Sequence, residues 1–187
     1  MGIKRTQKHQ MEFNKIRKAT LQELNESLNN ISEKEAEKFL DRLLKSRRIF
    51  VVGEGRSMLM LKAFAKRLRH LGKNSYVVGE TVTPAIGKGD LLVVASGSGK
   101  TSGVINIAQL AGRYKADVVF ITASPSPSLK KIADVIVTIP SAFPSRQLMA
   151  SLFEQTLLLF CDSVCLVLKD RLKISETQIR KNHANLE

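Results

Sequence analysis

The sequence predicts a doubly wound α/β fold, a three-layer αβα sandwich around a five-stranded parallel sheet. Five short runs rich in Val, Ile and Leu are spread through the middle of the chain, and such near-continuous apolar runs are typical of parallel strands buried on both faces. Most intervals between the runs are long enough for a crossover helix. Helical periodicity precedes the first run and follows the last one.

Length and composition support one globular domain. The chain has 187 residues, of which 43% are hydrophobic and 25% are charged, as in ordinary soluble proteins. We therefore expect a single domain over residues 1–187, with N-terminal helices at about 11–46, an α/β core at about 48–140 and C-terminal helices at about 148–182.

The first two helices precede the sheet. Apolar residues recur at helical spacing from Met11 to Leu44. Ser32 followed by Glu35 forms a capping-box pattern, which predicts that a second helix begins there. Lying outside the core, these helices are candidates for a layer through which copies of the chain associate.

The strands and loops of the core follow. The predicted strands cover residues 48–52, 74–78, 90–95, 117–122 and 134–139. We expect the common order 2-1-3-4-5. The interval 79–89, which contains Pro84, is predicted to be a loop, and the Ser/Pro segment 124–128 is predicted to end at the N-cap of a short helix from Leu129.

The C-terminal region is predicted to contain two helices, an apolar one over 148–172 and a short one over 175–181. Cys161 and Cys165 would share a face of the first of these and are expected to be small core residues rather than metal or redox ligands. No apolar run reaches the roughly 18–20 residues that a membrane span requires. We therefore expect a cytoplasmic protein with no membrane partner.

The formal net charge of +13 raises the question of nucleic-acid binding. However, Lys and Arg are scattered among acidic residues, and the chain has two Tyr and no Trp, so the usual nucleic-acid-binding patterns are missing. We expect no nucleic-acid partner. A basic surface would also attract a small anionic substrate.

Two predicted strands are followed by Gly/Ser loops, 53–57 (GEGRS) and 96–101 (SGSGKT). Glycine lets backbone N–H groups approach an anion, hydroxyls add donors, and a following helix adds its positive end. In the order 2-1-3-4-5 the two strands are neighbours, so both loops would face one crevice. Neither loop is a complete dinucleotide fingerprint or P-loop. These features predict a compact phosphate ester as ligand.

Several motifs together resemble the 6-phospho-3-hexuloisomerase family of the sugar isomerase (SIS) domain superfamily. The resemblance runs from about residue 20 to the C-terminus and rests on GEGRS, RLRHLG, VGETVTPAI, SGSGKT, SLFEQTLLLFCDSV and the terminal HANLE. It implies a SIS domain with additional terminal helices that converts D-arabino-3-hexulose 6-phosphate to fructose 6-phosphate, a step of the ribulose monophosphate pathway that follows formaldehyde fixation.

The resemblance also implies a homotetramer, or a dimer, with no metal ion and no cofactor. It assigns the phosphate to the second loop, with further contacts from the first. The residues so designated are Ser96, Ser98, Gly99, Thr101, Ser57, Arg56 and Gly55.

Glu154 is the candidate catalytic base. Moving a carbonyl between C3 and C2 proceeds through an enediol and needs one base with a suitable pKa. Glu154 begins an apolar helix, where burial would raise its pKa and the helix N-terminus would lower it. Two alternatives are open: a first-turn acid favoured by the helix dipole, or a capping box begun at Ser151.

His183 and Glu80 are further candidates. An imidazole titrates near neutral pH, so His183 could polarise the enediol oxygens, although a solvated tail histidine is the alternative. The resemblance suggests that the tail enters an active site, its own or that of a neighbouring subunit. Glu80 follows the second strand and would border the crevice. His70 is expected to be a packing or C-cap residue.

The chain departs from the usual family pattern at four positions. Glu54 and Met58 stand where a small residue and glycine are usual, Lys100 where many members have Glu, and Ala150 where glycine is usual. A carboxylate at position 54 would repel phosphate unless it points away or pairs with Arg56 or Lys100. Two alternatives therefore stay open: another sugar-phosphate aldose–ketose isomerase, and a non-catalytic sugar-phosphate-binding protein.

Overall fold

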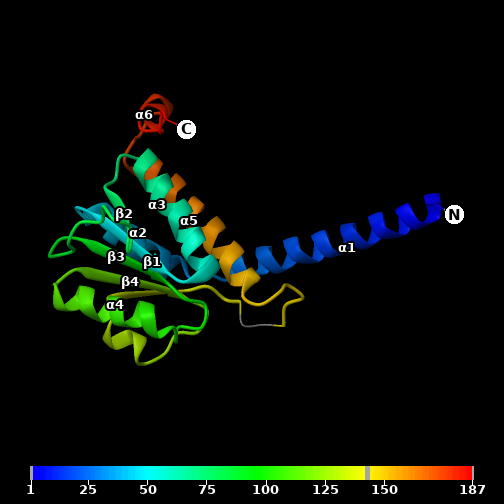
Figure 1. Cartoon of the computed structure of the whole chain (residues 1–187), viewed down its shortest axis with the longest axis horizontal. Helices are drawn as coiled ribbons and strands as arrows, with labels where there is room; N and C mark the ends of the chain where they lie inside the picture. Colours follow the sequence, from blue (N-terminus) through cyan, green and yellow to red (C-terminus); the bar gives the residue numbers. More distant parts are fainter. Residues whose placement is uncertain (1, 142–143, 187) are drawn as a thin grey trace.

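The computed structural model describes residues 2–141 and 144–186. Its centre is a five-stranded sheet in which every pairing is parallel and the order is β2-β1-β3-β4-β5. Helices cover both faces of the sheet (Figure 1). The predicted fold class and strand order are therefore confirmed.

The helices and strands lie close to their predicted positions. The strands are β1 (Ile49–Gly53), β2 (Ser75–Val77), β3 (Leu91–Ala95), β4 (Asp117–Thr122) and β5 (Val135–Thr138). The helices are α1 (Gly2–Asn29), α2 (Glu33–Lys45), α3 (Gly55–His70), α4 (Ser102–Arg113), α5 (Ser151–Arg171) and α6 (Glu176–Lys181), with the 3₁₀ helix η1 at Leu129–Lys131. Residues 79–89 form turns and coil, as predicted.

Alternate residues of each strand enter two separate cores. Val51 of β1 and Val93 of β3 belong to the core beneath α2, α3 and α5, whereas Val52 and Val94 belong to the core beneath α4. Figure 1 shows α4 below the strands and α5 above them, on opposite faces of the sheet. All residues of β1 and β3 are buried, which explains why these strands read as continuous apolar runs.

The start of α2 has the predicted N-cap residue but not the complete capping box. Ser32 is the N-cap, and its hydroxyl accepts a hydrogen bond from the backbone N–H of Glu35. The Glu35 carboxylate does not complete the capping box but accepts from the backbone N–H of Thr138 at 2.8 Å. A contact between α2 and the end of β5 therefore replaces the local one.

The start of η1 also differs in detail. Ser128 occupies the N-cap position, but its side chain makes no capping hydrogen bond. The Ser126 hydroxyl accepts from the backbone N–H of Leu129 instead, at 3.4 Å. The short helix lies where it was expected, and the residue that caps it is two positions earlier.

Helix α5 overturns the expectation that no segment is long and apolar enough to span a membrane. It has 21 residues, its most apolar 18-residue window has a mean hydropathy of 1.6, and 56% of that window is buried. Phe153, Leu157 and Cys161 on this helix belong to the core shared with α2 and α3. Cys161 and Cys165 are buried free thiols, as expected. A core helix of a soluble protein meets the same criterion of length and composition, and α5 packs as one.

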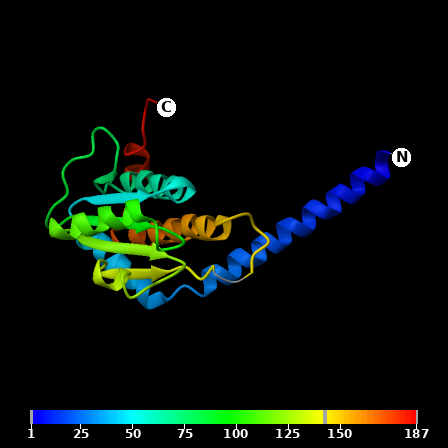
Figure 2. The same cartoon turned by 60° about the horizontal axis from the view of Figure 1, so that its bottom comes forward.

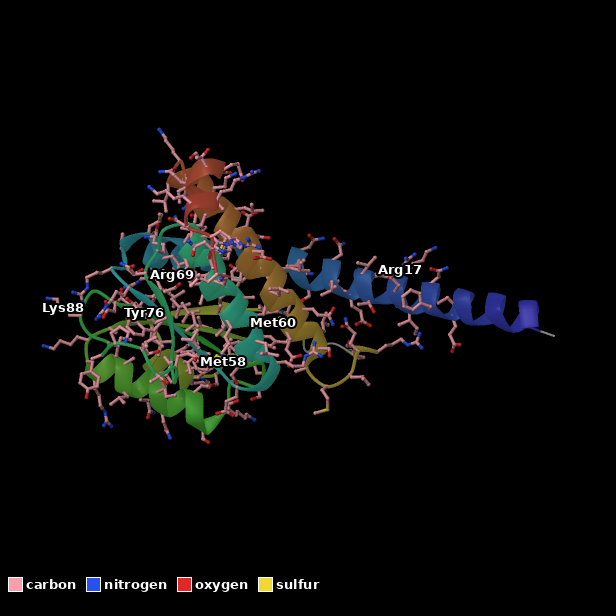
Figure 3. All side chains as sticks on the ribbon, turned by 45° about the horizontal axis from the view of Figure 1, so that its top comes forward. Arg17, Met58, Met60, Arg69, Tyr76 and Lys88 are labelled. Carbon is pink, nitrogen blue, oxygen red and sulfur yellow. The ribbon has the colours of Figure 1, made fainter. Side chains whose placement is uncertain are left out.

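Helix α1 extends beyond the body of the molecule. It begins at Gly2, nine residues before the predicted start, and its N-terminal part projects away from the sheet in both Figure 1 and Figure 2. Arg17 marks the projecting part in Figure 3. Phe13 and Leu21 are 65% and 59% exposed. The C-terminal end of the helix packs against α5, and Ser27 is fully buried.

Candidate active site

The loop between β1 and α3 is a tight turn at the carboxyl edge of the sheet. Gly53, the last residue of β1, pairs with Ala95, the last residue of β3. A Cβ at Gly53 would lie 3.1 Å from the backbone nitrogen of Met58, so a side chain would crowd the turn. Gly55 has a positive φ of 55°, which glycine adopts without strain. This geometry places Ser57, which is buried, in the first turn of α3.

The loop between β3 and α4 gathers three hydroxyl groups. The oxygens of Ser96 and Thr101 are 2.8 Å apart, and those of Ser96 and Ser98 are 3.5 Å apart. The Ser98 hydroxyl also accepts from the backbone N–H of Lys100. Thr101 is the N-cap residue of α4 without a capping bond from its side chain. The hydroxyls therefore cluster at the positive end of α4.

Two glycines allow this second loop to pack closely. Gly99 has a φ of +62°, and a Cβ there would lie 2.8 Å from the carbonyl oxygen of Ser124. A Cβ at Gly97 would lie 3.1 Å from the ring of Phe153 in α5. The loop is thus held between the end of β4 and the first turn of α5.

Glu154 lies in the first turn of α5 and is paired with Arg56 of α3. Its Oε2 is 2.6 Å from Nε of Arg56, and the residue is 8% exposed. Helix α5 begins at Ser151 with Ala150 as its N-cap, so the alternative of a capping box begun at Ser151 is wrong. Arg56, which we expect near the phosphate, ties the first turn of α3 to that of α5 through this ion pair with the buried carboxylate.

Glu54 extends toward the first turn of α4. The atom nearest to a Cβ built at Gly103 is a carboxylate oxygen of Glu54, close enough that the two would overlap. The Glu54 side chain therefore crosses from the first loop to the first turn of α4. A carboxylate is favourable there because of the helix dipole, and in this position it adds negative charge beside the hydroxyl cluster.

His183 and Glu80 lie outside this group. His183 stacks on His70 with ring centroids 4.9 Å apart, where α6 meets the C-terminal end of α3. Glu154 is at the other end of α5, whose 21 residues span about 30 Å. Within one chain the structure does not bring His183 to Glu154. Glu80 forms an exposed ion pair with Lys62 of α3 at 2.7 Å.

A cleft opens beside the second loop. It has a volume of about 320 Å³, and Gly97, Ser98, Phe153, Ser145 and Gln147 are among the residues that line it. It is bounded by the ends of β3 and β4, the start of α5 and the segment before α5. Its size and its hydroxyl and amide lining suit a small polar ligand.

Sequence reasoning missed Glu23 and Gln147. The Glu23 carboxylate of α1 accepts hydrogen bonds from the Ser145 hydroxyl and the Gln147 side-chain amide. The hydrogen bond from Ser145 is the main reason that the pKa of Glu23 is lowered. More than 120 residues separate these partners in the chain, and no motif surrounds Glu23, so the sequence carried no signal for the contact.

The arrangement can bind an oxyanion and move a proton. Hydroxyls, loop N–H groups and the α4 N-terminus supply donors for a phosphate, and Glu154 is a carboxylate that can accept a proton. Among residues 2–141 and 144–186, no group of three or more His, Cys, Asp or Glu side chains is placed to hold a metal ion.

Comparison with known proteins gives consistent matches. A family model described as the SIS domain matches residues 42–161. A Bacillus subtilis (strain 168) protein named 3-hexulose-6-phosphate isomerase is 42% identical over 175 residues, covering 89% of this chain and 95% of that protein. A Mycobacterium gastri protein of the same name is 44% identical over 147 residues, covering 75% and 74% of the two chains.

A solved structure agrees with these matches. The crystal structure of a Methanococcus jannaschii protein, for which a molecular function of 3-hexulose-6-phosphate isomerase was inferred, superposes with a TM-score of 0.81 at 34% identity. The superposition covers 94% of this chain and 99% of that one.

Proposed function

Because this chain belongs to the SIS domain family and, within it, to the 3-hexulose-6-phosphate isomerases, we propose that it interconverts D-arabino-3-hexulose 6-phosphate and fructose 6-phosphate. The observation that carries the assignment of roles is the buried carboxylate of Glu154 beside two Gly/Ser loops. The reaction would consume the hexulose phosphate formed when formaldehyde is fixed on ribulose 5-phosphate.

The second loop binds the phosphate in this proposal. The hydroxyls of Ser96, Ser98 and Thr101 lie together at the N-terminus of α4, where donors and the helix dipole favour an anion. Gly99 supports this arrangement because it lets the loop backbone turn against Ser124. Ser57 and the backbone at Gly55 contribute from the first loop.

Glu154 transfers the proton between carbons. It removes the proton from C2 of the 3-hexulose, which gives a 2,3-enediol, and returns it to C3. The proton of the O2 hydroxyl passes to O3, so the carbonyl ends at C2 and no atom is gained or lost. Arg56 holds the carboxylate in one orientation through its 2.6 Å ion pair, and its positive charge lies near the oxygens on which negative charge develops.

His183 acts, in this proposal, in the site of a neighbouring copy. It is exposed at the end of its own chain, beyond α6 and far from its own Glu154, and a tail at the surface can reach another subunit. The exposed apolar residues of α1, such as Phe13 and Leu21, support self-association. We therefore propose a homotetramer, or a dimer, as the active form.

The test is the variant Glu154→Gln in a coupled assay that supplies formaldehyde, ribulose 5-phosphate and a hexulose-phosphate synthase and then detects fructose 6-phosphate. Without the base, kcat is expected to fall by about 10²–10⁴-fold. Binding of inorganic phosphate should persist, because the second loop is unchanged. Unchanged turnover in this variant would show that Glu154 is not the catalytic base. An inactive wild type would contradict the proposed isomerase activity.

A second candidate is another sugar-phosphate aldose–ketose isomerase, which Glu54 favours. The family pattern has a small residue at position 54. In this chain the Glu54 carboxylate lies at the first turn of α4, where it could accept a hydrogen bond from a hydroxyl of a different sugar. A panel of sugar phosphates, followed by loss of deuterium from C1, C2 or C3, distinguishes the two reactions. Ligand-induced thermal stabilisation without turnover of any substrate would indicate a non-catalytic binding protein.

A further inference from the structure

Glu23 is the residue through which α1 holds the segment before α5. Its two carboxylate oxygens accept three hydrogen bonds, from the Ser145 hydroxyl at 2.6 Å, the Arg146 backbone N–H at 3.1 Å and the Gln147 side-chain amide at 3.0 Å. Three donors on one carboxylate favour its ionised form, in keeping with its lowered pKa. The contact is therefore charge-assisted and stronger than neutral hydrogen bonds.

A further hydrogen bond links Gln147 to α5. The side-chain oxygen of Gln147 accepts from the side-chain amide of Gln155 at 2.6 Å, and the Ser145 hydroxyl accepts from the backbone N–H of Gln147. Both ends of the Gln147 amide are thus used, one toward α1 and one toward α5. Gln155 is the neighbour of Glu154 in the chain.

Ser145 and Gln147 also form a wall of the cleft beside the phosphate loop. They line the same cleft as Ser98 and Phe153. A phosphate held on the second loop would place the sugar carbons within reach of this wall. The orientation of these two side chains then decides which polar groups the sugar meets.

We propose that Glu23 is a positioning residue for sugar recognition, which holds Ser145 and Gln147 in the orientation that binds the sugar portion of the substrate. This inference rests on the proposed function. Glu23 touches neither the phosphate nor the reacting carbons. Its effect is confined to the wall of the cleft, whereas the phosphate subsite is built from the loop 96–101.

The test compares Glu23→Gln with the control Glu26→Gln. Glu26 is exposed on the same helix, one turn further along, and its hydrogen bond to Asn30 uses only the backbone carbonyl. In Glu23→Gln a neutral amide replaces the charged acceptor, so the wall loosens. The dissociation constant of fructose 6-phosphate should rise about tenfold, as expected for the loss of charge-assisted hydrogen bonds, while that of inorganic phosphate stays within about twofold. The control should leave both constants unchanged.

Two outcomes would overturn the inference. One is a Glu23→Gln variant that binds fructose 6-phosphate as tightly as the control. The other is an equal loss of phosphate and fructose 6-phosphate affinity, which would indicate a general structural defect. If Glu23→Gln does not fold, Gln147→Ala tests the same link from the other side and should give the same selective loss. Wild-type turnover is scored separately, so failure of the isomerase assignment and failure of this inference are distinguishable.

Discussion

At the scale of single residues, Gly99 shows how tightly the second loop is built. It combines a left-handed φ of +62° with a position in which a Cβ would lie 2.8 Å from the carbonyl oxygen of Ser124. The obstacle is backbone and cannot rotate away as a side-chain end could. The conformation of the hydroxyl-bearing loop therefore depends on the absence of a single methyl group.

The substitution Gly99→Ala should strain the loop 96–101 and destabilise the protein. The left-handed conformation costs a non-glycine residue about 1–2 kcal/mol, and the clash with Ser124 adds to it. We expect a lower melting temperature and weaker binding of inorganic phosphate. Gly112→Ala in α4 is the matched control, because a Cβ there meets no atom within 4 Å and alanine is the better helix former. Equal phosphate binding in both variants would contradict the prediction.

At the scale of elements, the loop between β2 and β3 is held by one buried carboxylate at the amino edge of the sheet. Asp90 is fully buried and lies 2.6 Å from Arg48 of the segment before β1, and it accepts from the backbone N–H of Gly87 at 2.9 Å. Burial alone would raise the pKa of Asp90, but hydrogen bonds from Arg48, Gly87 and Arg47 outweigh it and lower the pKa. Asp90 thus stabilises the fold in its ionised form.

Asp90→Asn should therefore destabilise the protein in a pH-dependent way. We expect a loss of about 2 kcal/mol in the free energy of unfolding at pH 7, since hydrogen bonds to a charged group are replaced by neutral ones. A carboxyl with a lowered folded pKa stabilises above its unfolded pKa, and this stabilisation is lost as pH falls through the folded value. The difference between wild type and variant, measured by urea unfolding, should shrink below about pH 4. A difference independent of pH would exclude the charge as its cause.

The elements also show what the sequence could predict. The β-branched runs and the glycines after β1 and β3 gave the fold class, the strand order and the position of both loops, because these depend on local pattern. Partners far apart in the chain were not predictable. The Glu35 carboxylate reaches Thr138, and Arg56 pairs with Glu154, because tertiary geometry brought them together. The length of α1 was underestimated because its first nine residues carry no helical periodicity.

At the scale of the whole molecule, the excess of basic residues gives the protein a positive electrostatic potential. The net charge is +13, and much of it sits on exposed side chains such as Arg17 and Lys88, labelled in Figure 3. A positive surface raises the local concentration of an anionic substrate and accelerates its association. Sugar phosphates are anionic, so the charge favours the proposed reaction.

This attraction should be visible in the salt dependence of the kinetics. Salt screens charges beyond about 10 Å at 0.1 M ionic strength. Between 0.02 M and 0.3 M KCl, KM for the sugar phosphate should rise roughly two- to tenfold, while kcat changes little because the Glu154 carboxylate is itself buried. Chloride rather than phosphate or sulfate is used, so that the salt does not compete for the anion site. A KM independent of salt would argue against long-range steering.

The contact between Glu54 and Gly103 has a consequence for the evolution of related chains. Glu54 lies in the loop after β1 and Gly103 in the first turn of α4, yet the carboxylate occupies the space that a side chain at position 103 would need. A larger residue at position 103 would make the flexible Glu54 side chain rotate away and lose its favourable place at the N-terminus of α4, whereas a chain with a small residue at 54 would lose nothing. The two positions should therefore co-vary across homologues, and the combination of Glu at one and glycine at the other should mark a distinct branch of the family tree.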